Sequence, residues 1–395
     1  MKNQLSNRIN KLPISQTLAM AAKARELKTK GKDIISLSLG EPDFNTPDFI
    51  KDAAKTAIDD NYNWYTPVNG YLSLREAISR KFKRDNVLNY NPNQIVVSTG
   101  AKQALSNIVM VLVNPGDEVL LPAPFWVSYE AMVNLADGVS VPILTSIKTD
   151  FKITPAQLEK AITPKTKLIF FNSPNNPSGS VYSKEEYRAL ADVLVKYPNI
   201  YIVSDEIYEH ILFKGTNFSF ARFDDMYDRT ITVNGVSKSF AMTGWRVGYI
   251  GASEWIAKAC TKMQGQITSG TNCIAQIATI AALDAPVSEI KYMVDEFEIR
   301  RDLVLGLLAN IKGFKFNKPE GAFYVFPDIS YYFGKTIKGI AINSASDFSM
   351  LLLEKANVAT VTGEAFGQPN CIRISYATSQ QQLTEAMERI AELLK

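Results

Sequence analysis

The chain of 395 residues contains little cysteine and almost no histidine. Its three cysteines, Cys260, Cys273 and Cys371, are widely spaced and odd in number, which argues against a disulfide framework and favours a reducing compartment. The only histidine, His210, excludes a metal site built from several histidines and argues against a serine–histidine–aspartate triad. We therefore predict no metal centre and interpret His210 as a structural residue.

Long apolar runs and strong net charge are also missing. No run approaches the ~18 residues that span a bilayer, and the N-terminus lacks the apolar segment of a signal peptide. The net charge of +3 is too small to argue for a nucleic-acid or membrane partner. Hydrophobic residues make up 46% of the chain, which excludes a disordered protein. We expect a cytoplasmic globular protein with neither kind of partner.

Between about residues 48 and 280, short apolar runs alternate with stretches of helical spacing. The runs predict five strands: Gln94–Ser98, Glu118–Leu121, Lys167–Phe171, Ile200–Val203 and Thr230–Val233. Each run is nearly continuous in apolar residues, which is typical of strands that are buried on both faces. The pattern predicts an α/β fold whose large three-layer domain has a mostly parallel sheet flanked by helices.

The pattern changes near residue 290. A long charged helix is expected over Met293–Leu308, followed by strands at Gly321–Phe326 and Cys371–Tyr376 and by a C-terminal amphipathic helix. A helix over residues 16–30 and a short strand at Ile34–Leu39 precede the large domain. We predict that residues 1–47 join a smaller α+β domain formed by residues 291–395, and that residues 48–290 form the large domain.

Three charged residues follow the predicted strands, at the edge of an open α/β sheet where ligands bind. Asp205 ends one apolar run, Lys238 lies just beyond the next, and Arg246 follows eight residues later. Pyridoxal phosphate chemistry requires such a set, because the amine forms a Schiff base, the acid pairs with the pyridinium nitrogen and the arginine holds the phosphate. Taken singly, Lys238 is an ordinary solvated lysine and Asp205 a helix cap.

Further polar and aromatic residues follow the other strands. Gly100 belongs to a turn that runs into a helix, where N–H groups suit a phosphate, although an ordinary turn is the alternative. Trp126 either offers its face to a planar ring or fills the core. Asn176 and Tyr208 are placed to hydrogen-bond an oxygen of the same ring. Arg373 is either part of a surface edge strand or a bidentate clamp on a substrate α-carboxylate.

Four motifs resemble those of the class I aminotransferases, the fold type I pyridoxal phosphate-dependent enzymes. They are Ser98-Thr-Gly-Ala-Lys-Gln-Ala, Asn175-Asn-Pro-Ser-Gly, Ser204-Asp-Glu-Ile-Tyr and Ser237-Lys-Ser-Phe-Ala-Met-Thr-Gly-Trp-Arg-Val-Gly. The resemblance covers almost the full chain, from Ser38 to Ala377, and the sequence is most similar to the bacterial aspartate aminotransferase subgroup. It implies the fold type I architecture with pyridoxal phosphate in the large domain.

The resemblance also implies roles for individual residues. The implied catalytic residues are Lys238 as the Schiff-base lysine, Asp205 on the pyridine nitrogen and Tyr208 on the phenolic oxygen. The implied cofactor-binding set is Gly100, Ala101, Lys102, Trp126, Asn176, Asp205, Tyr208, Ser237, Lys238 and Arg246, and the implied substrate-binding set is Gly40, Lys102, Trp126, Asn176 and Arg373. Tyr65 matches a tyrosine that reaches the phosphate in the neighbouring subunit, which implies a homodimer with shared sites.

The residue that would bind a second substrate carboxylate is less directly indicated. Many aspartate aminotransferases use an arginine here, but the corresponding stretch, residues 264–272, contains none. In the subgroup that the chain resembles, a lysine at the position of Lys102 takes this role, and Ser15 and Thr17 are placed to assist. Some members accept prephenate and carry a lysine near the start. Here Pro13 occupies that place and Lys11 is close to it, which argues against this activity.

We therefore predict a pyridoxal phosphate-dependent transaminase that moves the amino group of L-aspartate, or a related amino acid, to 2-oxoglutarate by a ping-pong mechanism. The alternatives are a β-eliminating C–S lyase on the same scaffold and a transaminase of broader or aromatic and prephenate specificity. A regulator with an aminotransferase-like domain would need a DNA-binding extension, which the roughly 35 residues before the first strand do not provide. The chain contains neither G-x-G-x-x-G nor a P-loop motif.

Overall fold

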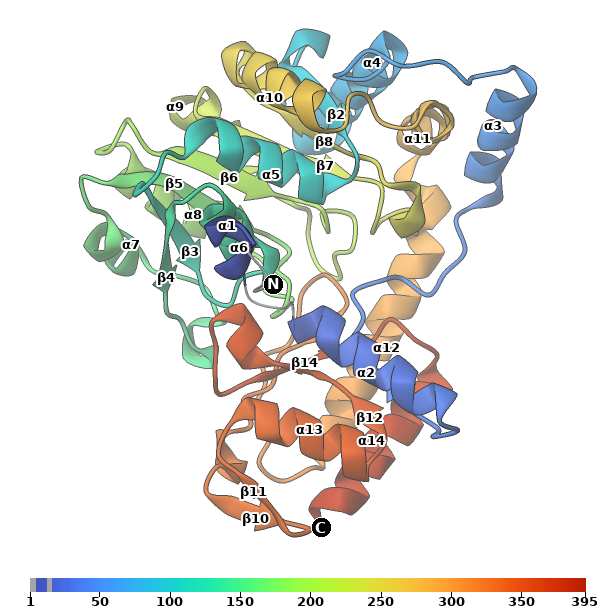
Figure 1. Cartoon of the computed structure of the whole chain (residues 1–395), viewed down its shortest axis with the longest axis vertical. Coiled ribbons are helices and arrows are strands. Elements are labelled where there is room, and N and C mark those ends of the chain that lie inside the picture. The colour runs from blue at the N-terminus through green and yellow to red at the C-terminus, as the bar shows by residue number, and fades with distance from the viewer. Residues whose placement is uncertain (1–4, 13–15) are drawn as a thin grey trace.

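The computed structural model describes residues 5–12 and 16–395, the side chains of residues 16–18 excepted. Figure 1 shows a twisted sheet with helices on both faces and, below it, a smaller group of helices and short strands. Helix α1 (Asn7–Asn10) lies beside the large sheet, helix α2 (Gln16–Thr29) belongs to the lower group, and the chain then returns to the upper one. From helix α12 (Lys291–Ala309) onward it forms the rest of the lower group.

The large sheet has seven strands in the order β2-β8-β7-β6-β5-β3-β4. Their bounds are Ile95–Ser98 (β2), Glu118–Pro122 (β3), Val139–Ile143 (β4), Thr166–Asn172 (β5), Tyr201–Asp205 (β6), Thr230–Gly235 (β7) and Gly248–Gly251 (β8). Strands β3 to β7 run parallel to one another, and β8 is antiparallel to both β2 and β7. The prediction of a mostly parallel sheet flanked by helices is confirmed.

Alternate side chains of each strand pack into separate helical layers. On β5, Leu168 and Phe170 pack in a cluster with helices α5, α6 and α10, whereas Ile169 and Phe171 pack on the opposite face with α8. This alternation is the two-residue period of a strand, and it explains the continuous apolar runs, because both faces are covered. Helices α3, α4 and α11 cover the second face near β2 and β8. The helices of these layers are α3 (Asp48–Asp59), α4 (Leu72–Lys81), α5 (Ala101–Leu112), α6 (Ser128–Leu135), α7 (Pro155–Ala161), α8 (Lys184–Leu194), α9 (Asp224–Tyr227), α10 (Glu254–Ile267) and α11 (Cys273–Asp284).

The lower group has its own core. A three-stranded antiparallel sheet, β13-β14-β9, packs with helices α12, α13 and α14, and strand β1 pairs in parallel with β12. The bounds here are α2 (Gln16–Thr29), β1 (Ile35–Ser36), α12 (Lys291–Ala309), β9 (Tyr324–Val325), β10 (Lys335–Ile337), β11 (Ile340–Ile342), α13 (Ala345–Lys355), β12 (Val358–Ala359), β13 (Val361–Thr362), β14 (Ile372–Ser375) and α14 (Gln380–Leu394); a short helix α1 (Asn7–Asn10) lies near α6. The β1–β12 pairing is the contact expected of an N-terminal segment that joins a small domain. The exact domain division stays a prediction.

Two strands of the large sheet were not predicted. Strand β4 contains Pro142 and lies at the sheet edge, where a missing N–H is tolerated. Strand β8 consists of only four residues, two of them glycine, so its sequence has no strand-like run. It forms because β2 and β7 flank it on both sides. Gly248 also leaves room for the backbone of Ala101, because a Cβ on residue 248 would lie only 2.1 Å from the Ala101 nitrogen.

Within the described part of the chain, no single helix is long and apolar enough to span a bilayer. The segments Cys273–Asp284 and Val287–Ala309 are long and apolar enough only when taken together, and the chain bends by 106° between them.

Candidate active site

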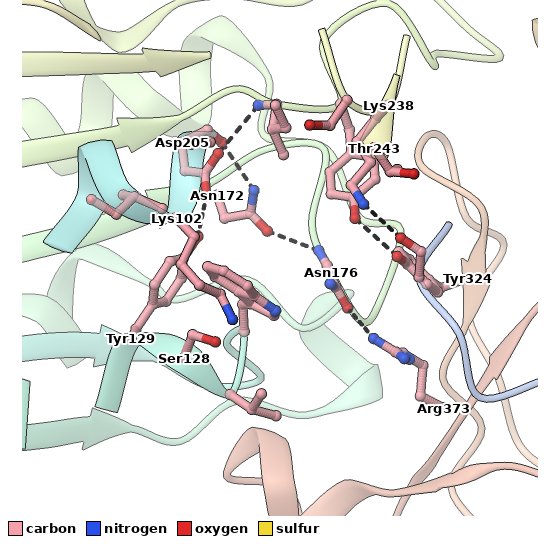
Figure 2. A pocket seen from close by; sticks show the side chains of 18 of the residues that line it. Lys102, Ser128, Tyr129, Asn172, Asn176, Asp205, Lys238, Thr243, Tyr324 and Arg373 are labelled. Atoms are coloured by element: carbon pink, nitrogen blue, oxygen red, sulfur yellow. Dashed lines mark hydrogen bonds between the residues drawn. The ribbon is translucent and has the colours of Figure 1, made fainter. Parts of the chain in front are cut away.

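A cavity of about 330 Å³ lies at the carboxyl ends of β5, β6 and β7, beside the start of α5. Its lining combines residues of the large sheet with residues of the lower group (Figure 2). Of the predicted site residues, it is lined by Gly40, Ala101, Lys102, Trp126, Asn176, Asp205, Tyr208, Ser237, Lys238, Arg246 and Arg373. The parallel strands explain this convergence, since their carboxyl ends meet at the same edge.

Asp205 is the acid of the cavity. It is the last residue of β6 and only 4% exposed. The Tyr129 hydroxyl donates to Asp205 Oδ2 over 2.6 Å and the Ile207 amide donates to Oδ1 over 3.2 Å. Burial raises the pKa of Asp205 to about 6, although these hydrogen bonds and Lys238 oppose the rise. The bond to Ile207 is a local turn contact and no helix follows, so the helix-cap alternative is wrong.

Lys238 lies three residues beyond the end of β7 and points its amine at the N-terminal segment. Its Nζ donates to the Gly40 carbonyl over 2.5 Å. Burial lowers the pKa of Lys238 to about 8; Glu41 opposes this shift, and Arg373 and Arg246 add to it. The neutral fraction of the amine near physiological pH is therefore much larger than that of an ordinary lysine, and the neutral form is the one that acts as a nucleophile or a proton acceptor.

Tyr208 faces a second tyrosine that the sequence did not indicate. The hydroxyls of Tyr208 and Tyr324 are 2.9 Å apart, and both side chains are buried. Tyr324 also lies so close to Gly40 that a Cβ there would be 2.5 Å from its hydroxyl. Any side chain at position 40 would therefore push into the cavity wall.

The start of α5 and Arg246 form the cationic end of the cavity. Gly100 has φ +84°, a left-handed conformation that permits the helix to begin at Ala101, and a Cβ on it would lie 2.2 Å from Arg246 Nη2. Arg246 Nη1 donates to the Thr243 carbonyl over 2.8 Å. The first N–H groups of a helix have no acceptor within it, so this end combines free amides with a guanidinium and suits an anion.

Lys102 and Trp126 lie together on the cavity wall. Lys102 Nζ is 4.9 Å from the centre of the Trp126 ring. Burial, followed by the charge of Arg246, lowers the pKa of Lys102. Trp126 is only partly buried and lines the cavity, so its ring is available to a ligand rather than enclosed in the core.

Arg373 lies at the opposite end of the cavity from Asp205 (Figure 2). It is 2% exposed, so the surface-strand alternative is wrong. Its Nη1 donates to Asn176 Oδ1 over 3.0 Å and its Nη2 to the Ser38 carbonyl over 2.6 Å, whereas the buried Nε has no partner within the described chain. The guanidinium also lies over the Tyr324 ring, 4.7 Å from its centre.

Unpaired charge is the main property of this cavity. Among the residues that the structure describes, Lys102, Arg246 and Arg373 have no carboxylate within 4.0 Å, and Asp205 has no cation within that distance. Asp205 and Arg373 are buried, and a buried charge is costly unless it is paired, whereas Lys102 and Arg246 are exposed. The cavity therefore fits a ligand with a protonated ring nitrogen near Asp205, an anionic group near Arg246 and a carboxylate near Arg373, which are the features of pyridoxal phosphate with an amino acid.

Several predicted positions do not line the cavity. Gly100 packs against the guanidinium of Arg246, and the Tyr65 side chain is fully exposed. Lys11 forms an ion pair with Asp137 over 3.2 Å, on the helical layer near α6. Pro13 and Ser15 lie outside the described residues, as does the side chain of Thr17.

His210 belongs to a group of possible metal ligands with Asp85 and Glu209. Its Nε2 lies 3.2 Å from Asp85 Oδ2. Lys81 already pairs with Glu209 and Arg84 with Asp85. Although burial opposes ionisation, hydrogen bonds from His210 and Arg84 hold the pKa of Asp85 well below its usual range. A dication would face these two cations, so we interpret His210 as a structural residue.

Comparisons with known proteins agree with this geometry. Residues 32–390 match the family "Aminotransferase class I and II". The aspartate/prephenate aminotransferase of Cereibacter sphaeroides is 48% identical over 98% of this chain and 97% of its own length. Two solved aspartate aminotransferases share the fold: that of Rhizobium meliloti (TM-score 0.96, 43% identity, 99% and 98% of the two chains) and that of Thermus thermophilus with maleate (TM-score 0.93, 42% identity, 99% and 100%).

Proposed function

This chain belongs to the class I and II aminotransferase family, and from that premise we propose that it transfers the amino group of L-aspartate to 2-oxoglutarate with pyridoxal phosphate as cofactor. The observation that carries the proposal is the distribution of charge in the cavity, with a buried acid at one end and a buried arginine at the other. Relatives named aspartate aminotransferase support aspartate as the donor.

The cofactor, when bound, supplies an electron sink that weakens the Cα–H bond of the amino acid. Lys238 would hold the cofactor through its amine and, once the amino acid has displaced it, would take the proton from Cα and pass it to the cofactor carbon that receives the amino group. Asp205 would keep the ring nitrogen protonated, and Tyr208 and Asn176 would donate to the ring oxygen. Trp126 would pack against the ring.

The remaining residues hold the two anionic ends. The backbone amides of Ala101 and Lys102, at the start of α5, are suited to the phosphate together with Ser237 and Arg246. Arg373 is suited to the α-carboxylate. Asn176 and Gly40 flank Arg373 and complete that end. Aspartate leaves as oxaloacetate before 2-oxoglutarate enters and leaves as glutamate, so the cycle is ping-pong.

The direct test uses the purified protein loaded with pyridoxal phosphate. L-Aspartate added without any 2-oxo acid is expected to bleach the visible band and release one equivalent of oxaloacetate. Pyruvate and ammonia from a cysteine conjugate would instead indicate the lyase alternative. A protein that stays colourless with the cofactor would refute the proposal.

Lys102 is proposed to bind the distal carboxylate of aspartate. The support is its unpaired amine in the cavity wall and the maleate, a dicarboxylate, in the Thermus thermophilus structure. Lys102→Ala is expected to raise KM for aspartate by about 10- to 100-fold, the loss for a hydrogen bond to a charged group worth roughly 1.5–3 kcal/mol. KM for alanine, which has no distal carboxylate, serves as the control. Equal increases for both amino acids would contradict the assignment.

Prephenate is the second candidate acceptor, because the Cereibacter sphaeroides relative carries it in its name. Lys11, the lysine nearest to the expected position, is paired with Asp137 instead of facing the cavity. We therefore rank prephenate below 2-oxoglutarate. Measured kcat/KM values for the two acceptors decide the order.

We also propose a homodimer in the cytoplasm. Trp64 and Tyr65 are 79% and 101% exposed, and aromatic rings next to each other on a surface are typical of interfaces. In the dimer, Tyr65 would reach the phosphate end of the partner's cavity. Sedimentation at micromolar concentration checks this, and a single monomeric species would contradict it.

A further inference from the structure

The loop after β6 distributes its side chains between two sides of the backbone. Asp205 and Tyr208 line the cavity. Glu206 and Glu209 do not; they are only 2% and 5% exposed and lie in a buried cluster of polar side chains, where Glu209 borders a separate surface cavity. The proposed mechanism uses neither glutamate, so their burial requires an explanation of its own.

We call this cluster the Lys81 network; its members are Lys81, Asn86, Glu206, Glu209 and Ser219. Lys81, the last residue of α4, donates to the Glu209 carboxylate and to Asn86 Oδ1, the latter over 2.7 Å. Asn86 Nδ2 lies 2.6 Å from Glu209 Oε2 and 3.1 Å from Glu206 Oε2, so one amide joins the two carboxylates. Ser219 Oγ donates to Glu206 Oε2 over 2.6 Å.

Two further side chains hold the Glu206 carboxylate, one just before the loop and one after it in the sequence. Ser204 Oγ donates to Glu206 Oε1 and Asn217 Nδ2 donates to Oε2, each over 2.9 Å. The back of the loop is thus connected to α4, to the π-helical segment Phe82–Asn86 and to residues 217–219. The loop cannot shift toward or away from the cavity without breaking several of these bonds.

Stability alone does not explain the network. Two carboxylates and an ammonium group lose their hydration when they are buried, and apolar residues of similar volume are often at least as stable in such positions. Removing one partner is costly, because it leaves an unpaired charge. A network of this kind is retained where it fixes one arrangement of the backbone.

We propose that Lys81, Asn86, Glu206 and Glu209 are positioning residues that set the places of Asp205 and Tyr208 in the cavity. This inference rests on the proposed function, in which Asp205 and Tyr208 touch the cofactor. The two residues on the cavity side and the two on the network side alternate along the same five-residue segment, so a displacement of one pair displaces the other.

Two sets of variants test the proposal on the protein saturated with pyridoxal phosphate. Lys81→Met with Glu209→Met replaces the ion pair by apolar side chains. It leaves Glu206, whose pKa burial raises to about 7, with its hydrogen bonds from Ser204 and Ser219. Glu206→Ala removes the second carboxylate, and Glu206→Gln keeps its shape. The double variant and Glu206→Ala are expected to lower kcat for aspartate by about 10²-fold, the effect of a misplacement near 1 Å. Glu206→Gln is expected to restore most of the rate.

Two readouts do not depend on turnover. Amide hydrogen exchange of residues 204–210 is expected to accelerate in the double variant and in Glu206→Ala, and the pH midpoint of the cofactor's visible band is expected to shift. Arg301→Met is the matched control, since Arg301 is a buried cation, 4% exposed, that pairs with Glu298 and Asp302 outside the cavity.

The outcomes separate the two proposals. Folded variants whose kcat, visible band and loop exchange equal those of Arg301→Met would overturn the positioning role. If the double variant does not fold, the comparison of Glu206→Ala with Glu206→Gln tests the positioning role by the same readouts. If the wild-type protein does not transaminate aspartate, the proposed function fails, but the exchange and band measurements still test whether the network positions the loop.

Discussion

Replacing Lys238 with alanine is expected to lower kcat/KM for aspartate by at least about 10⁴-fold, because proton transfer by a positioned side chain alone contributes 10²–10⁴-fold. Lys238 has two tasks in the proposed mechanism: it holds the cofactor and it carries the Cα proton. No other lysine amine is near enough to substitute among the described residues, since Lys102, the other lysine of the cavity, lies over Trp126 at the wall. Single-turnover absorbance with excess aspartate measures the loss.

The control for this prediction is Lys148→Ala, which removes an exposed lysine outside the cavity. It should leave the rate unchanged. Lys238→Arg keeps a positive charge but has no neutral amine at working pH, so it should be as inactive as the alanine variant. Aspartate turnover within tenfold of the wild type in either Lys238 variant would refute the assignment of this lysine.

The large domain and the acid and amine of the site could be predicted because both depend on local pattern. Continuous apolar runs indicate strands buried on both faces, and parallel strands bring their carboxyl ends to one edge. Asp205 and Lys238 follow adjacent strands of the sheet, β6 and β7, so their meeting follows from the topology. The family resemblance then added Gly40 and favoured the clamp interpretation of Arg373, and both residues come from distant segments.

Other parts of the site depend on packing that no local pattern reveals. Tyr129, which hydrogen-bonds Asp205, lies on α6, and its helical spacing resembles that of any core tyrosine. Tyr324 reaches Tyr208 from the lower group of strands across 116 residues of sequence. Lys81 and Glu209 are 128 residues apart, and neither lies in one of the motifs that indicated the function. Such partners become visible only when the chain is folded.

Replacing Asp205 with asparagine is expected to lower kcat by on the order of 10²–10³-fold, the usual cost of removing one preorganised electrostatic group. Asparagine has the same shape but only one acceptor oxygen in place of two. With that oxygen accepting from the Ile207 amide, its NH2 group can donate to the Tyr129 hydroxyl, so the fold should be retained. It cannot, however, neutralise a protonated ring nitrogen. The ring then stabilises less negative charge as the Cα proton leaves. Steady-state kinetics and thermal unfolding of the same sample separate the rate effect from instability.

The pH dependence of cofactor binding gives a second test of Asp205 that needs no turnover. Burial raises the pKa of this carboxyl to about 6 in the protein without ligand, so it is neutral below that pH and charged above it. The charged form alone attracts a cationic ring. Affinity for pyridoxal phosphate should therefore rise as the pH increases through about 6. The asparagine variant should lack this rise, whereas Tyr129→Phe, which keeps the carboxylate, should retain it. A rise of equal size in the asparagine variant would assign the titration to another group and remove Asp205 from the ring nitrogen.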